Sequence, residues 1–372
     1  MKRRTFLPLA TSCLAAPAVW AQTRASNIWR IASSLPLTGA QASYGEAKRD
    51  GAAAYASMIN AKGGIAGRKL QLHALDDAYV EARTGENIAA LLKEHSPVAY
   101  TGFFGAPSCM VAAKALAQLQ QVGVGFTTGS NSFRTQPQRE VFPVRASFVR
   151  ESEAIVQHQR TTGIKQAVVA YVNIPFGQLA KGTFEAAAQA QGLALAPPIE
   201  VKADGSNLAD AVKALKAHNV ILMGLHTPSA MSLVQALRKD GETGQQLWCL
   251  SAVDTAVMAG KLKEASRGVA TSLVVPSVSK VSIAIVREYL AATQAINKPA
   301  SSYGLEAFIE MKTLGLGLAR LRGEGPQAMI TAMESIGKND MGGFEVMYGP
   351  SDRTGARFVD LAIISDLRNI RS

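Results

Sequence analysis

The chain is poor in cysteine, in aromatic side chains and in long hydrophobic runs. Only three of its 372 residues are cysteine, and aromatic residues make up 6%. Three cysteines are too few for the disulfide framework of a small secreted domain. Beyond the N-terminus, no apolar run approaches the roughly 18 residues that suggest a membrane-spanning helix. Hydrophobic residues still make up 48% of the sequence, so we expect a sizeable core and about two globular domains.

Beyond the N-terminus, the sequence also has no cluster of charges of one sign. The formal net charge is +11, and three of these positive charges lie before residue 22, so the rest of the chain carries +8. The basic residues stand singly among acids, as in Arg83 and Glu86, and form no stripe interleaved with aromatic residues. We therefore expect no nucleic-acid partner.

Enzyme motifs are missing as well. The patterns HExxH, GxSxG and GxxxxGK[ST] do not occur. The histidines are scattered: His73, His95, His158, His218 and His226. We expect no catalytic residues, no cofactor and no metal site.

The N-terminus has the parts of a secretory signal. Basic residues at 2–4 precede an apolar run from Phe6 to Trp20, and the small residue Ala21 follows. We expect cleavage after Ala21, which predicts a periplasmic protein. The adjacent Arg3 and Arg4 also fit a twin-arginine signal, so the general and the twin-arginine export routes both remain open.

The most informative stretch covers residues 98–134. Two apolar strands are expected here, at 98–101 before Gly102 and at 124–127 before Thr128, with a helix at 108–121 between them. In a parallel sheet, ligands bind beyond the carboxyl ends of the strands, near helix N-termini. The carboxyl ends of both expected strands would therefore line one cleft. The alternative is that Gly102, Gly105 and Gly129 only form turns.

Strands and helices alternate along the rest of the chain, which predicts an α/β fold with two lobes. Further strands are expected at residues 29–35, 68–75, 141–144, 167–172, 194–201, 220–224, 247–250, 269–276, 344–348 and 357–365. Further helices are expected at 45–61, 83–94, 151–161, 177–191, 208–218, 229–240, 282–296, 301–321 and 326–336. Cys109 and Cys249, the cysteines beyond the signal, fall in different lobes, so we expect free thiols.

Several segments resemble the branched-chain-amino-acid-binding family of type I periplasmic solute-binding proteins, which serve ABC transporters. They are Pro36-Leu37-Thr38-Gly39, Tyr44-Gly45, residues 60–67, Asp76-Asp77, residues 142–147 and residues 357–361. The resemblance implies two doubly wound lobes joined by three crossover segments, with the ligand cleft between them. It places residues 27–146 and 278–348 in lobe one, and 147–277 and 349–372 in lobe two.

The resemblance also implies the ligand-binding residues. In lobe one, hydroxyl groups and backbone N–H groups at two loops would hold a ligand carboxylate. Taken over both lobes, the candidate ligand-binding residues are Tyr44, Phe104, Gly105, Ala106, Ser108, Thr128, Gly129, Ser130, Phe176, Leu225, His226, Asp254 and Tyr303. Some have an alternative role: Tyr44 as a hydrophobic staple at a helix start, His226 on a solvated rim, and Phe104 and Tyr303 in the core.

The lobe-two loop at residues 251–254 bears on ligand chemistry. Family members that bind α-amino acids pair the ammonium group with an acid here, and this loop has no acid squarely at that place. Because a buried ammonium group without a partner is strongly disfavoured, we expect a carboxylate ligand with an apolar or aromatic body that lacks the ammonium. Asp254 is close enough to leave an amino acid as the alternative.

The resemblance therefore implies a monomeric solute-binding protein that passes a small molecule to an ABC permease in the inner membrane. The alternative is a sensor of the same fold that acts on a receptor or regulator.

Overall fold

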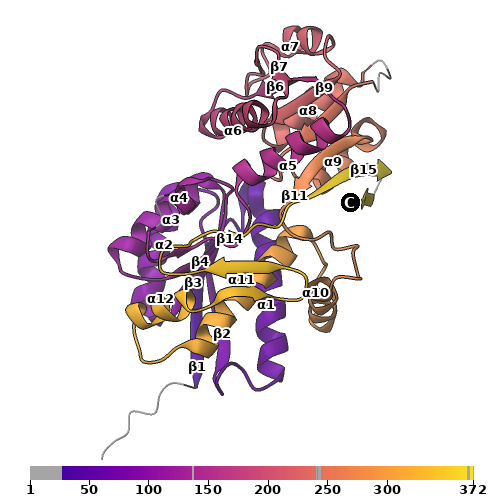
Figure 1. Cartoon of the computed structure of the whole chain (residues 1–372). Helices are drawn as coiled ribbons and strands as arrows, with labels where there is room; N and C mark the ends of the chain where they lie inside the picture. The colour runs from indigo at the N-terminus through magenta and orange to yellow at the C-terminus, as the bar shows by residue number, and fades with distance from the viewer. Residues whose placement is uncertain (1–26, 136–137, 240, 242–243, 367–368, 372) are drawn as a thin grey trace, which may run out of the picture.

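A computed structural model describes residues 27–135, 138–239, 241, 244–366 and 369–371. Two sheets with helices on both faces form two lobes; the first sheet is parallel, and the second is parallel except for its antiparallel strands β15 and β16 (Figure 1). We call the elements around the five-stranded sheet the first lobe and those around the eight-stranded sheet the second lobe. The expected α/β class with two doubly wound lobes is confirmed. The predicted signal segment, residues 1–21, lies outside the described residues.

The first lobe is built on a sheet of five parallel strands in the order β2-β1-β3-β4-β5. These strands are β1 (Ile28–Leu35), β2 (Lys69–Asp76), β3 (Ala99–Phe104), β4 (Gly123–Thr127) and β5 (Val141–Phe142). The helices are α1 (Ala42–Ala61), α2 (Glu81–His95), α3 (Ala106–Gln118), α4 (Ser132–Thr135), α10 (Ala284–Ala295), α11 (Ser302–Arg320) and α12 (Pro326–Glu334). A three-stranded antiparallel sheet adjoins them, with β12 (Gly337–Asp340), β13 (Glu345–Tyr348) and β14 (Gly355–Ala356).

The second lobe has an eight-stranded sheet in the order β16-β15-β11-β10-β9-β6-β7, with β8 also paired to β6. Its strands are β6 (Gln166–Tyr171), β7 (Ala194–Leu195), β8 (Ile199–Glu200), β9 (Val220–Gly224), β10 (Gln246–Cys249), β11 (Val269–Leu273), β15 (Asp360–Asp366) and β16 (Asn369–Arg371). Its helices are α5 (Phe148–Thr161), α6 (Pro175–Gln191), α7 (Leu208–Leu215), α8 (Thr227–Leu237) and α9 (Thr255–Leu262).

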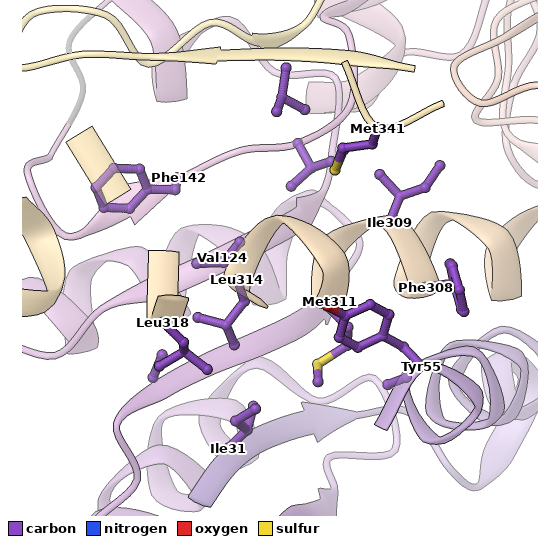
Figure 2. Close-up of a cluster of buried hydrophobic side chains, with 14 of the residues drawn as sticks. Ile31, Tyr55, Val124, Phe142, Phe308, Ile309, Met311, Leu314, Leu318 and Met341 are labelled. Atoms are coloured by element: carbon purple, nitrogen blue, oxygen red, sulfur yellow. The ribbon is translucent and has the colours of Figure 1, made fainter. Parts of the chain in front are cut away.

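Helix α11 fills the centre of the first lobe, although it follows most of the second lobe in the sequence. Figure 2 shows its side chains Phe308, Leu314 and Leu318 in the same cluster as Ile31 of β1. The ring of Phe308 meets Tyr55 of α1 edge-on, at 5.4 Å between centroids. Two distant parts of the chain therefore share one hydrophobic core.

Each sheet has one point where the strand order reverses. In the first sheet, the chain runs from β1 to β2 on one side and then to β3 on the other. In the second sheet, it runs from β6 to β7 and β8 on one side and then to β9 on the other. Ligands of open α/β sheets bind beyond the carboxyl ends of the strands at such points. The loops after β1, β3, β6 and β9 are therefore the places to look for a site.

The sequence was misread in several places. Strand β3 does not break at Gly102 but continues to Phe104, because Gly102 takes a positive φ of 80° within the strand. The short helix α9 was not expected, nor were strands β12 and β14.

Cys109 on α3 and Cys249 on β10 are free and buried. No helix among the described residues is long and apolar enough to cross a membrane.

Candidate functional site

An aromatic cluster lies where the first sheet reverses. Tyr44 in the first turn of α1 stacks on Phe104 at the end of β3, with 4.9 Å between ring centroids. Tyr303 in the first turn of α11 meets Tyr44 edge-on, also at 4.9 Å. Tyr79, which the sequence analysis did not select, adds a fourth ring 6.0 Å from Phe104. Three predicted residues from distant parts of the chain are thus brought together.

The loop after β3 has a backbone that only glycine fits. Gly105 has a φ of +80°, and a Cβ at this position would lie 2.5 Å from the Tyr79 ring. Gly105 precedes α3, and no side chain among the described residues caps this helix, so the backbone N–H groups of Ala106 and Ser108 in its first turn can meet an acceptor, whereas Pro107 has none to offer. The Ser108 hydroxyl is buried and has no hydrogen-bond partner among the described residues.

The loop after β4 supplies hydroxyl groups nearby. The Ser130 N–H donates to Thr128 Oγ1 at 3.2 Å, and the Ser130 hydroxyl lies 2.9 Å from that of Ser132. Gly129 packs against Phe148 so closely that a Cβ would come within 2.4 Å of its ring. Arg134 donates to the Ser130 carbonyl at 2.9 Å and thereby holds this loop in place.

Three predicted residues of the second lobe lie at the ends of β6 and β9. Phe176 meets Phe148 edge-on at 5.5 Å. His226 precedes α8, and its Nδ1 is buried without a hydrogen-bond partner among the described residues. Leu225 differs from the other two because its side chain is fully buried in the core of the second lobe. The structure therefore does not bring the Leu225 side chain together with the aromatic cluster.

The two lobes face each other at this place. The Tyr44 hydroxyl of the first lobe lies close to Asp254 and Thr227 of the second lobe. Asp254 precedes α9, accepts from Val257 N at 2.9 Å and donates its own N–H to Thr227 Oγ1 at 3.0 Å. Burial and the charge of Asp254 raise the pKa of Tyr44 to about 12. Burial also raises the pKa of Asp254, against the opposing effect of its hydrogen bonds.

A cavity of about 110 Å³ lies next to Asp254 and is lined by both lobes. Tyr303 and Glu306 of α11 contribute from the first lobe, and Ser251 and Asp254 from the second. Arg145, in the segment that leads from one lobe to the other, completes the charged lining. A larger cavity of about 290 Å³ is lined by residues near the start of β1 and before α12, away from the predicted residues.

A buried polar network lies beneath the cavity. Arg145 donates to Ser251 Oγ at 2.6 Å, and its Nη1 is 3.7 Å from Glu306 Oε1. Glu151 accepts from Ser251 N at 2.8 Å, from Ser251 Oγ at 2.9 Å and from Ser272 Oγ at 2.6 Å. Arg145 therefore connects to both lobes.

The network continues into the first lobe. Lys48 of α1 contacts both carboxylate oxygens of Glu310, at 2.9 and 3.0 Å, and both side chains are fully buried. The sequence analysis missed these residues and Glu306. A signal was available, because two acids four residues apart in an otherwise apolar helix are unusual.

The arrangement suits reversible binding of a small molecule. Aromatic rings offer an apolar contact, and the loops offer hydroxyl and N–H donors. The described residues contain no group of three or more His, Cys, Asp or Glu placed to hold a metal ion.

Comparison with known proteins agrees with this fold. The family model described as periplasmic binding protein matches residues 29–363. A substrate-binding periplasmic protein from Ralstonia solanacearum superposes with a TM-score of 0.81 at 26% identity, over 92% of this chain and 99% of that one. A possible leucine/isoleucine/valine-binding protein from Rhodopirellula baltica SH 1 gives 0.79 at 25% identity, over 91% and 94%.

A third structure, similar in fold alone, is an ABC transporter solute-binding protein from R. palustris in complex with 4-hydroxybenzoate. Its TM-score is 0.81 at 16% identity, over 93% of this chain and 95% of that one. A comparison with curated proteins gives no match.

Proposed function

We propose, because the chain belongs to the periplasmic binding protein family, that it captures a small molecule between its lobes and delivers it to an ABC importer in the inner membrane. The cavity that both lobes line carries this proposal. It lies where Tyr44 of the aromatic cluster comes close to Asp254 of the second lobe. A ligand held there would contact both lobes and favour the closed form over the open one.

The ligand is an amino acid or another carboxylate-bearing compound with an apolar or aromatic body. Its carboxylate binds to the hydroxyl and N–H groups of the loops at Gly105 and Ser130, where α3 begins without a side-chain cap. Its body packs against Tyr44, Phe104 and Tyr303. The structural neighbours support this breadth, since one is a complex with leucine and another with 4-hydroxybenzoate.

The limits of the lobes remain part of the proposal. We place residues 27–146 and 278–348 in lobe one, and 147–277 and 349–372 in lobe two. The pairing of β14 with β13, and the hydrogen bond from Ala356 N to Val144 O at 2.7 Å, favour moving the third crossing to a point after Ala356.

Thermal unfolding with a panel of carboxylates tests the function. A ligand at about 100 times its Kd stabilises the fold by roughly 2.7 kcal/mol, which gives a clear shift in Tm. Tyr44→Phe keeps the ring and loses the hydroxyl, whereas Tyr44→Ala loses both. We expect Tyr44→Ala to weaken binding more than Tyr44→Phe. Equal affinity in both variants and in the unmodified protein would place the ligand elsewhere.

A further inference from the structure

We infer that the first lobe has a second binding site, the cavity of about 290 Å³ at the start of β1, and that this site binds an organic anion with an apolar body. The candidate ligand site lies beyond the other end of β1. Because β1 has eight residues, its two ends are about 25 Å apart. Figure 1 shows the start of β1 at the end of the first lobe that faces away from the second lobe. The inferred site is therefore separate from the site between the lobes.

Three segments that are distant in the sequence form most of this cavity. They are residues 28–30 at the start of β1, residues 96–98 between α2 and β3, and residues 323–326 between α11 and α12. Arg68, which precedes β2, lies on the same wall as Trp29. Strand pairing holds β1 between β2 and β3, so these walls are in place before any ligand arrives. The volume is close to the lower limit of small-molecule sites, roughly 300 Å³.

Positive charge exceeds negative charge in the lining. Its charged residues are Arg30, Arg68 and Glu324, which leaves one net positive charge. Burial lowers the pKa of Arg68, the charge of Glu324 opposes this, and the charge of Arg30 adds to the lowering. The two arginines therefore lie close enough to repel each other. A negative group bound between them would relieve this repulsion.

Arg68 is held in place and still has a donor to offer. Its guanidinium group stacks on Trp29, 3.4 Å from the ring centroid, and its Nη2 donates to the Ile28 carbonyl at 2.9 Å. Its Nε is buried and has no hydrogen-bond partner among the described residues. A buried donor without an acceptor is unfavourable, and a donor that is already oriented loses little freedom on binding. Arg68 is thus prepared to receive an acceptor atom.

Arg30 is the second donor of the site. Its backbone carbonyl accepts from Val98 N at 2.9 Å, which fixes the position of the residue in the sheet. Its side chain has no hydrogen bond and no ion pair within the part of the chain that the structure describes. The guanidinium group can therefore turn toward an anion beside Arg68 without breaking an existing contact.

The rest of the lining decides what kind of anion fits. Leu92, Val98 and Leu321 contribute apolar side chains to the wall. A small inorganic anion would leave these side chains in contact with water. A cation bound to Glu324 would be repelled by both arginines. An organic monoanion, such as a sulfonate or a carboxylate on an apolar body, matches both the single net charge and the apolar wall.

A matched pair of fluorescent probes tests this inference. 8-Anilinonaphthalene-1-sulfonate and N-phenyl-1-naphthylamine share one ring system, and only the first carries a sulfonate. We expect fluorescence titration of the exported protein near neutral pH to show the sulfonate binding about tenfold or more tightly than the neutral probe. Added salt should reduce this preference, because it screens the partly exposed arginines. Equal affinity for the two probes, or no binding of the sulfonate, would show the inference to be wrong.

Variants of the lining then locate the sulfonate. Arg30→Gln and Arg68→Gln should each weaken its binding about fivefold or more and leave the neutral probe within about twofold. Glu324→Gln should tighten sulfonate binding about twofold or more, which damage to the fold would not do. Arg150→Gln is the matched control, because Arg150 pairs with Glu153 on the surface of α5. If Arg68→Gln does not fold, the Arg30 and Glu324 variants decide, and an unchanged sulfonate affinity in both would overturn the inference.

One further variant distinguishes the two sites. Tyr44→Ala changes the aromatic cluster beside the second lobe, about 25 Å from this cavity, and should leave the sulfonate affinity within about twofold. If Tyr44→Ala weakens sulfonate binding while the arginine variants do not, the probe occupies the site between the lobes and the inferred site does not exist. That result would leave the proposed function intact.

Discussion

Replacing Lys48 with methionine leaves the Glu310 carboxylate buried without its cation. Removing one partner of a buried ion pair destabilises a protein by roughly 3–5 kcal/mol, because the remaining charge cannot be solvated. Glu310 can escape this penalty by taking a proton. Burial raises its pKa to about 7 although Lys48 acts in the opposite direction, so without Lys48 the pKa rises further.

The sign of the pH dependence follows from these values. A glutamate whose folded-state pKa lies above the unfolded value of 4.5 stabilises the fold at low pH, and this contribution is lost as the pH rises through the folded pKa. In the unmodified protein the loss ends near pH 7, and in Lys48→Met it continues above that pH. The difference in the free energy of unfolding between the unmodified protein and Lys48→Met should therefore widen by about 1.4 kcal/mol per pH unit above 7.

Urea unfolding at about pH 6.5 and about pH 8.5 measures this gap, and we expect it to grow by about 2 kcal/mol between the two conditions. The double variant Lys48→Met/Glu310→Leu should recover most of the loss and show no such pH dependence. Lys338→Met, which breaks an exposed pair with Glu345, should cost at most about 1 kcal/mol at either pH. Equal losses at both pH values for Lys48→Met, or a loss that grows toward low pH, would refute the reasoning.

Three further predictions concern other parts of the chain. Thiol titration should count two reactive cysteines after unfolding and none before it, since Cys109 and Cys249 are buried and burial raises the pKa of both thiols; fewer than two in the unfolded chain would indicate a disulfide. Gly105→Ala should destabilise the fold by about 1–3 kcal/mol in urea unfolding, because alanine is strained at a φ of +80° and collides with Tyr79; an unchanged midpoint would contradict this. Intact mass of the exported protein should give Gln22 as its first residue, whereas a species that keeps the signal segment would not fit.

The fold could be predicted because most of its elements carry strong local signals. Helix α11 was expected at residues 301–321 and spans Ser302–Arg320, where Ser301 caps it by accepting from Gly304 N at 3.0 Å. Gly102 was misread because a glycine with positive φ can lie inside a strand as well as end it. Helix α9 was missed because its eight residues do not separate into an apolar and a polar face, whereas those of the equally short α7 do.

The candidate site was only partly accessible from the sequence. Tyr44, Phe104 and Tyr303 were selected from the resemblance, and the structure brings them together, but their role in binding remains a prediction. Glu306 could not be assigned to the cavity from the sequence. Its position there depends on the tertiary packing of α11 against α1 and the parallel sheet, which no local pattern records.

The placement of α11 also affects how the chain can fold during its synthesis. Lys48 and Glu310 are separated by 262 positions, and the core around them includes Tyr348 and Ala356. While the chain is being synthesised, its N-terminal half therefore has no complete core to fold around. The first lobe can close only after almost the whole chain has left the ribosome. The second lobe has no such requirement for most of its strands, because β6 to β11 lie within one continuous stretch of the chain.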